Sequence, residues 1–207
     1  MEPSVAYWNR IARRYAKQPI ANEAEYQNKL EITRRYLKPH MKVLEFGCGT
    51  GSTALIHGPR VQEYMAIDLA PNMIEIANEK LQESGLSNLH FQVAKLEDFS
   101  SQSEIYDVIL GLNILHLLKQ KEKAIELVYQ LLKPGGVFVS STACLKQGLN
   151  PFRLVAPFTR IFRLPMINVF SRGELEQCLI RKGFKLDHQW VPEHSPLVYF
   201  IVAVKPN

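Results

Sequence analysis

The sequence predicts an α/β fold with a mostly parallel seven-stranded sheet and helices on both of its faces. Three observations support this prediction: short apolar runs alternate with amphipathic segments of helical period, a glycine-rich turn follows the first run, and a short proline-containing connection joins the last two runs. Parallel strands need long crossovers between them, whereas a short connection favours an antiparallel pair. We therefore expect the last strand to be antiparallel.

Seven segments have the length and composition of strands, namely residues 42–46, 64–67, 89–93, 106–110, 137–141, 184–191 and 197–204. A predicted helix over residues 71–84 begins with proline and is followed by glycine. Another passes through residues 124–131 and ends at the Pro-Gly-Gly turn 134–136. Ser171 and Glu174 have the spacing of a capping box that opens a further helix.

Two amphipathic helices precede the first strand, and the second opens with a possible capping box of Asn22 and Glu25. No repeat, low-complexity tract or linker divides the chain. We therefore predict a single domain over residues 1–207, with residues 1–38 as a helical cap.

Cysteine usage and hydropathy limit the class of protein. The three cysteines, Cys48, Cys144 and Cys178, are too few and too widely spaced for a disulfide framework or a zinc site. The first residues lack the apolar core of a secretion signal, and the longest nearly apolar stretch, 105–118, is too short to cross a bilayer. We therefore expect a cytoplasmic protein without a metal site.

The glycine-rich turn is the most informative segment of the chain. It reads VLEFGCGTGS at residues 43–52 and follows a buried strand, so the backbone can turn tightly and let a ligand approach closely. Asp68 closes the second strand 21 residues after Gly47, where a carboxylate can accept hydrogen bonds from both hydroxyls of a ribose. Glu45 suits a ligand that carries an amino group and suits a pyrophosphate poorly.

Four motifs in order resemble those of class I S-adenosylmethionine-dependent methyltransferases: LEFGCGTG at 44–51, IDLAPNM at 67–73, YDVIL at 106–110 and LLKPGG at 131–136. The ordered set is more specific than the glycine turn alone. The first helix, around residues 7–15, is more distantly similar to the cap of ubiquinone and menaquinone C-methyltransferases. The resemblance implies a Rossmann-like methyltransferase fold and S-adenosyl-L-methionine as the cofactor.

The resemblance also implies roles for individual residues. Those expected to bind the cofactor are Gly47, Cys48 and Gly49 at the methionine moiety, Glu45 near its amino group, Asp68 at the ribose, Leu69, Met73, Leu96 and Glu97 around the adenine, and Leu112 at the end of the fourth strand. Lys95 departs from the family pattern, in which aspartate is common at its position. The contact with the adenine amino group is therefore expected to shift to Glu97, Asp98 or the backbone.

Two side chains are candidates for catalysis. His116 follows the fourth strand and could act as a base, or it could be a packed helix residue. Tyr15 in the cap has the same two interpretations. A nucleophilic role for Cys48 is disfavoured, because no neighbour in the sequence would activate the thiol.

The main functional hypothesis is methyl transfer to a small, apolar or anionic acceptor by in-line displacement. Three alternatives stay open: a non-catalytic protein that binds S-adenosylmethionine, a methyltransferase acting on nucleic acid or protein, and an oxidoreductase with a nicotinamide cofactor. Nucleic acid is disfavoured because solvated helix faces explain the aromatic and basic residues at 7–17 and 34–38. The oligomeric state stays open.

The net charge of +5 is unevenly distributed. Residues 127–173 include six basic residues, whereas Asp and Glu are absent from this stretch. Within this stretch, residues 143–170 form an insert in which Arg153, Arg160 and Arg163 lie among apolar side chains. The insert is either an ordinary connection that completes the core or a wall of the acceptor site. In the second case its arginines would meet an anionic group or, by peripheral contact, an anionic membrane surface.

Overall fold

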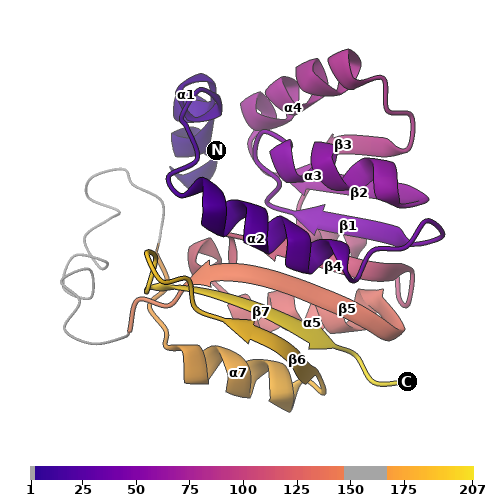
Figure 1. Cartoon of the computed structure of the whole chain (residues 1–207), viewed down its shortest axis with the longest axis vertical. Coiled ribbons are helices and arrows are strands. Elements are labelled where there is room, and N and C mark those ends of the chain that lie inside the picture. Colours follow the sequence, from indigo (N-terminus) through magenta and orange to yellow (C-terminus); the bar gives the residue numbers. More distant parts are fainter. Residues whose placement is uncertain (1–2, 147–166) are drawn as a thin grey trace.

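The computed structural model describes residues 3–146 and 167–207. Its centre is a seven-stranded sheet in the order β3-β2-β1-β4-β5-β7-β6 (Figure 1). The strands are β1 (Lys42–Phe46), β2 (Glu63–Asp68), β3 (Leu89–Val93), β4 (Tyr106–Leu112), β5 (Leu132–Ala143), β6 (Lys185–Trp190) and β7 (Val198–Val204). Strands β1 to β5 pair in parallel, whereas β7 pairs antiparallel with both β5 and β6. The predicted fold class and the antiparallel last strand are confirmed.

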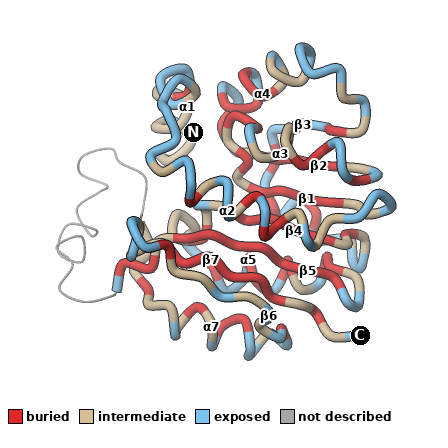
Figure 2. The backbone as a smooth tube through the Cα atoms, viewed as in Figure 1, coloured by how far each residue is buried: buried red, intermediate tan, exposed pale blue. Residues whose placement is uncertain are grey.

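Helices cover both faces of the sheet. They are α1 (Pro3–Ala16), α2 (Glu23–Arg34), α3 (Ser52–His57), α4 (Pro71–Ser84), α5 (Lys121–Leu131) and α7 (Arg172–Arg181), with short 3₁₀ turns η1 (Gly58–Arg60), η2 (Leu96–Phe99) and η3 (Leu115–Leu117). Side chains of α2, α3 and α4 share one apolar cluster with the sheet, and those of α5 and α7 share the other. The central strands are accordingly buried, and the outer surfaces of the helices are exposed (Figure 2).

The turn before β5 differs from the prediction. The helix α5 ends at Leu131, and β5 already begins at Leu132, so the Pro-Gly-Gly segment lies within the strand. The Gly135 N–H donates to the Lys205 carbonyl at 2.9 Å, and the Lys205 N–H donates to Gly136 at 2.9 Å. Pairing with the segment after β7 therefore extends β5 through residues that were expected to form a turn.

The two predicted capping boxes have different outcomes. At α7, Ser171 Oγ accepts from the Glu174 N–H at 3.2 Å and the Glu174 carboxylate accepts from the Ser171 N–H at 2.7 Å, so this box is confirmed. At α2, Asn22 Oδ1 accepts from the Glu25 N–H at 3.1 Å, but the reciprocal half is wrong. The Glu25 carboxylate instead accepts from the backbone N–H of residue 194 at 2.8 Å and from the hydroxyl of residue 195 at 2.6 Å. It thereby ties α2 to the connection between β6 and β7.

The N-terminal helix α1 packs on α4. Ala12 is fully buried and shares an apolar cluster with Met73 and Ile76. Asn9 Oδ1 accepts from the Asn72 N–H at 2.9 Å. The start of the cap is therefore held against the helix that follows β2.

The arginines of the insert, Arg153, Arg160 and Arg163, lie outside the described residues, so their roles stay predictions. Across the described parts of the chain, no helix is both long enough and apolar enough to span a membrane.

Candidate functional site

The glycine turn after β1 has a left-handed backbone at three positions, with φ of +69° at Gly47, +55° at Gly49 and +76° at Gly51. A Cβ at Gly47 would lie 2.7 Å from the side chain of Ile114, which allows no side chain there. A Cβ at Gly49 would meet only Tyr15, at 4.0 Å. Gly49 therefore presents bare backbone to the space under α1, where a ligand can approach it closely.

Asp68 joins the end of β2 to this turn. Its Oδ2 accepts from the Gly49 N–H at 3.0 Å, and its Oδ1 accepts from the Ala70 N–H at 2.9 Å. Burial raises the pKa of Asp68 from its ordinary value, although these backbone donors oppose that effect. The residue at the N-cap of α4 is Ala70, so Asp68 is more than a helix cap. Each of its oxygens keeps a second lone pair for a ligand.

Glu45 lies beneath the turn and is 3% exposed. The hydroxyl of Tyr64 donates to its Oε2 at 2.8 Å. Burial, together with the nearby charge of Asp68, raises the pKa of Glu45 to about 7, and the hydrogen bond from Tyr64 acts in the opposite direction. A cation that approached this carboxyl would restore its charge, whereas an anion would be repelled.

Cys48 is buried in the same turn. Burial raises the pKa of its thiol well above the ordinary value, and the carboxylates of Glu45 and Asp68 add to the effect. Because the thiolate is the nucleophilic form, this environment disfavours cysteine chemistry, in agreement with the sequence analysis.

The side chains expected around the adenine lie in different environments: Leu69 is half-buried, Met73 is buried between α1 and α4, Leu96 is buried and Glu97 is exposed. The carboxylate of Asp98 accepts from the Lys95 N–H at 2.8 Å. Asp98 is therefore engaged in its own turn, and Glu97 is the freer of the two acids that could replace the usual aspartate. The adenine contacts stay predictions.

His116 lies in η3, beside β5. Its Nδ1 lies 3.1 Å from Thr142 Oγ1 and accepts from the Ala143 N–H at 3.4 Å. Burial lowers the pKa of His116 to about 4, so the imidazole is neutral at pH 7. Since Nδ1 accepts from the backbone, the ring proton belongs on Nε2, and the free edge of the ring is a hydrogen-bond donor. A base at this edge would require the other tautomer.

Tyr15, the second catalytic candidate, lies on α1 above the glycine turn and is 43% exposed. Its ring packs edge to face on Trp8, with ring centroids 5.8 Å apart. Partial burial and the charge of Asp68 raise the pKa of Tyr15, which keeps its hydroxyl protonated. Tyr15 therefore covers the turn as a neutral side chain.

Lys80 of α4 is a site residue that the sequence analysis missed. Its ammonium donates to the Thr50 carbonyl at 3.0 Å, to Thr50 Oγ1 at 3.2 Å and to Ser52 Oγ at 3.2 Å. The signal was a lysine between Ala77 and Leu81, on the apolar face of the helix. By binding the outer side of the glycine turn, Lys80 holds the turn in place.

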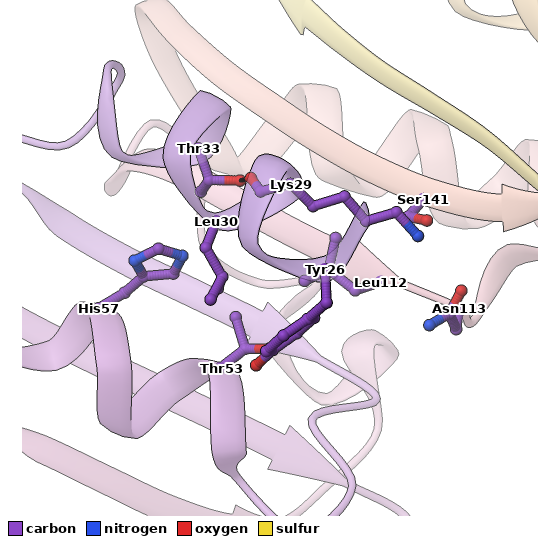
Figure 3. A pocket seen from close by; sticks show the side chains of 9 residues that line it. All are labelled: Tyr26, Lys29, Leu30, Thr33, Thr53, His57, Leu112, Asn113 and Ser141. Carbon is purple, nitrogen blue, oxygen red and sulfur yellow. Dashed lines mark hydrogen bonds between the residues drawn. The ribbon is translucent and has the colours of Figure 1, made fainter. Parts of the chain in front are cut away.

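A pocket of about 70 Å³ lies between α2 and the ends of β4 and β5 (Figure 3). The residues that line it are Tyr26, Lys29, Leu30 and Thr33 of α2, Thr53 and His57 of α3, Leu112 and Asn113 at the end of β4, and Ser141 of β5. Leu112, expected at the cofactor, thus lies beside a cavity whose other residues the sequence analysis did not identify.

Comparison with known proteins supports one family. Residues 37–163 match the family model described as "Methyltransferase domain", which is more than half of the chain. The uncharacterized methyltransferase YcgJ of Bacillus subtilis is 30% identical over 132 residues, which cover 64% of this chain and 52% of that protein. The hybrid PKS-NRPS synthetase apdA of Emericella nidulans is 34% identical over 128 residues, which cover 58% of this chain and 3% of that protein.

Solved structures share the fold. The phosphoethanolamine N-methyltransferase 2 of Haemonchus contortus, in complex with phosphomonomethylethanolamine and S-adenosylhomocysteine, superposes with a TM-score of 0.76 at 16% identity. The alignment covers 88% of this chain and 53% of that one. By sequence, the chain spans about half the length of YcgJ and a small part of the hybrid synthetase.

Proposed function

The chain belongs to the methyltransferase domain family, which makes S-adenosylmethionine its cofactor, and we propose that it transfers the methyl group of this cofactor to a small-molecule acceptor. The observation that carries the proposal is the hydrogen bond from the Gly49 N–H to Asp68, which brings bare backbone together with the carboxylate that is expected to bind the ribose. A dinucleotide with a pyrophosphate fits this place poorly, because the buried carboxyl of Glu45 lies near Cys48 and Asp68.

The residues present fit this cofactor. Asp68 keeps lone pairs for the two ribose hydroxyls, and Gly49 leaves space for the methionine moiety. Glu45 has a pKa raised to about 7, so an ammonium group nearby would favour its charged form. Tyr15 would cover the cofactor from the side of α1. Lys80 would keep the glycine turn rigid, so that ordering this turn would add little to the entropic cost of binding the cofactor.

When bound, the cofactor supplies an activated methyl group on a sulfonium, and the transfer is an in-line displacement. The chain then has to align the acceptor with the methyl group and exclude water. His116 would contribute Nε2–H as a donor to an oxygen of the acceptor, since its Nδ1 accepts from the backbone. A thiolate or an amine that reaches the site unprotonated needs no base for this step.

The test has two stages. Calorimetry with S-adenosylhomocysteine and with NAD should give binding of the first and none of the second. Incubation with isotopically labelled S-adenosylmethionine and a metabolite extract should then reveal a small labelled product. Binding of NAD alone would contradict the cofactor. Label found only in nucleic acid or protein, or in nothing at all, would contradict the small-molecule acceptor.

A further inference from the structure

The pocket behind α2 contains polar atoms without partners. Both ring nitrogens of His57 and the hydroxyl of Ser141 are buried and accept or donate no hydrogen bond within the described chain. His57 is 0% exposed and Ser141 is 1% exposed, and both line the cavity. Buried polar groups are nearly always paired with protein, water or ligand. These two side chains therefore point to a polar occupant of the pocket.

The charges around the pocket indicate the sign of that occupant. Lys29 lines the cavity, and Figure 3 shows its side chain extending toward the end lined by Ser141. Burial lowers the pKa of Lys29, and its ammonium has no hydrogen-bond or ion-pair partner among the described residues. Glu25, the acid that acts on Lys29, is held by residues 194 and 195. Among the described residues no carboxylate lines the pocket, so the Lys29 ammonium faces it without a hydrogen-bonded or ion-paired acid.

Positively charged side chains also lie near the end of the pocket that His57 lines. Burial lowers the pKa of His57 to about 4, and the charges of Arg34 and Arg60 add to the effect. The imidazole is therefore neutral at pH 7 and carries one N–H donor. Figure 3 shows this ring at the opposite end of the pocket from Ser141 and from the tip of Lys29, so an oxygen anion whose charge Lys29 balances takes its hydrogen bonds from Lys29 and Ser141.

The size and place of the pocket separate its occupant from the cofactor. A volume of about 70 Å³ is far below the roughly 300–1,000 Å³ of a site for a whole drug-sized ligand, but it accommodates a carboxylate-sized group. In the sheet order β2-β1-β4-β5, Asp68 ends β2, whereas the pocket adjoins the ends of β4 and β5. The pocket thus lies across the glycine turn from the expected position of the ribose.

We propose that this pocket binds a carboxylate-sized anionic group of the methyl acceptor, with the Lys29 ammonium and the Ser141 hydroxyl as its donors and the His57 ring at the other end of the same pocket. The assignment rests on the proposed function, because it specifies the acceptor of the same reaction. The body of the acceptor extends out of the pocket past Asn113, toward the glycine turn. The enzyme thereby selects acceptors that carry an anion at a fixed distance from the methylated atom.

The experiment uses the full chain saturated with S-adenosylhomocysteine and labelled at the histidine ring carbons. The chain has six histidines, so the spectrum is simple, and a His57→Gln variant assigns the relevant signal. Acetate is titrated at constant ionic strength, with acetamide as the neutral control of the same shape. We expect acetate, and not acetamide, to shift the His57 signal saturably.

Two variants test the donors. Lys29→Met keeps the length of the side chain and should weaken acetate binding by about tenfold or more, because a charge-assisted hydrogen bond is lost. Ser141→Ala should weaken it by less, since the hydroxyl is neutral. Lys123→Met, on the exposed side of α5, is the matched control and should bind acetate as the wild type does.

Several results would overturn the assignment. Acetate could leave the His57 signal unchanged, or Lys29→Met could bind acetate as tightly as Lys123→Met. Acetate could also compete with S-adenosylhomocysteine, and Lys29→Met could weaken the binding of S-adenosylhomocysteine. The anionic group in the pocket would then be the carboxylate of the cofactor. Failure of the wild type to bind S-adenosylhomocysteine at all would refute the proposed function itself. If S-adenosylhomocysteine binds and acetate does not, only the pocket assignment fails.

Discussion

Replacing Glu45 by glutamine should stabilise the protein while weakening its hold on the cofactor. The carboxyl is 3% exposed, and burial raises its pKa from 4.5 to about 7. At about 1.36 kcal/mol for each pKa unit, keeping this group charged in the folded state costs about 3 kcal/mol. Glutamine has the same shape, carries no charge and can still accept the hydrogen bond from Tyr64.

The sign of the pH dependence follows from the direction of the shift. Because the pKa is higher in the folded state, the folded protein binds the proton more tightly than the unfolded chain does. The contribution of Glu45 is therefore fully present below pH 4.5, is lost as the pH rises to about 7, and stays lost above that. The glutamine variant should equal the wild type at pH 4.5 and exceed it by up to about 3 kcal/mol at pH 8.

Urea unfolding at pH 4.5, 6 and 8 measures this difference directly. In a chain of this size about 3 kcal/mol corresponds to a rise in Tm of roughly 6–12 °C. Glu83→Gln, an exposed change on α4, is the matched control and should leave the curves unchanged. A Glu45→Gln variant no more stable than the wild type at pH 8 would refute the reasoning. Calorimetry at pH 8 should show weaker binding of S-adenosylhomocysteine, since the proposed partner of its ammonium group is gone.

Three further predictions concern the site. Asp68→Asn should weaken binding of S-adenosylhomocysteine by about tenfold or more, because charge-assisted hydrogen bonds are worth roughly 1.5–3 kcal/mol each; an unchanged Kd in a folded variant would limit Asp68 to holding the glycine turn. Gly49→Val should abolish this binding in calorimetry, whereas Cys48→Ser should retain both binding and turnover. Loss of turnover alone in the serine variant would show that the thiol of Cys48 has a role in the reaction. His116→Ala should lower turnover of the identified acceptor without changing Kd for the cofactor. Because the pKa of His116 is about 4, the ring should cause no inflection in the wild-type kcat between pH 5 and 8. An inflection near pH 6 that disappears in the alanine variant would assign His116 as a base.

The sequence was sufficient for those parts of the site that depend on chain order. The strand before Gly47 and the strand that ends at Asp68 are adjacent and parallel, so their carboxyl ends meet whatever the surrounding side chains are. The sequence alone therefore predicts that Gly49 and Asp68 lie together. A different argument from chain order located the antiparallel last strand, because a short connection favours an antiparallel pair.

Side chains that meet only through tertiary packing could not be placed in this way. The carboxylate of Glu25 has the spacing of a capping box, yet it binds a loop 169 residues further along the chain. His57 and Ser141 are ordinary residues of a helix and a strand until α2 closes over them. The tautomer of His116 likewise depends on a backbone N–H of β5. Nothing in the local pattern specifies any of these partners.

The position of β7 has a consequence for how the chain is made. This strand lies between β5 and β6, although both precede it in the sequence. While the chain is being synthesised, β5 leaves the ribosome with an open edge, and β6 has no neighbour to pair with until β7 follows. An open edge with buried valine and phenylalanine side chains invites pairing with other chains. The nascent protein is thus exposed to aggregation in the interval between β5 and β7, because the edge of β5 stays open until β7 has been made.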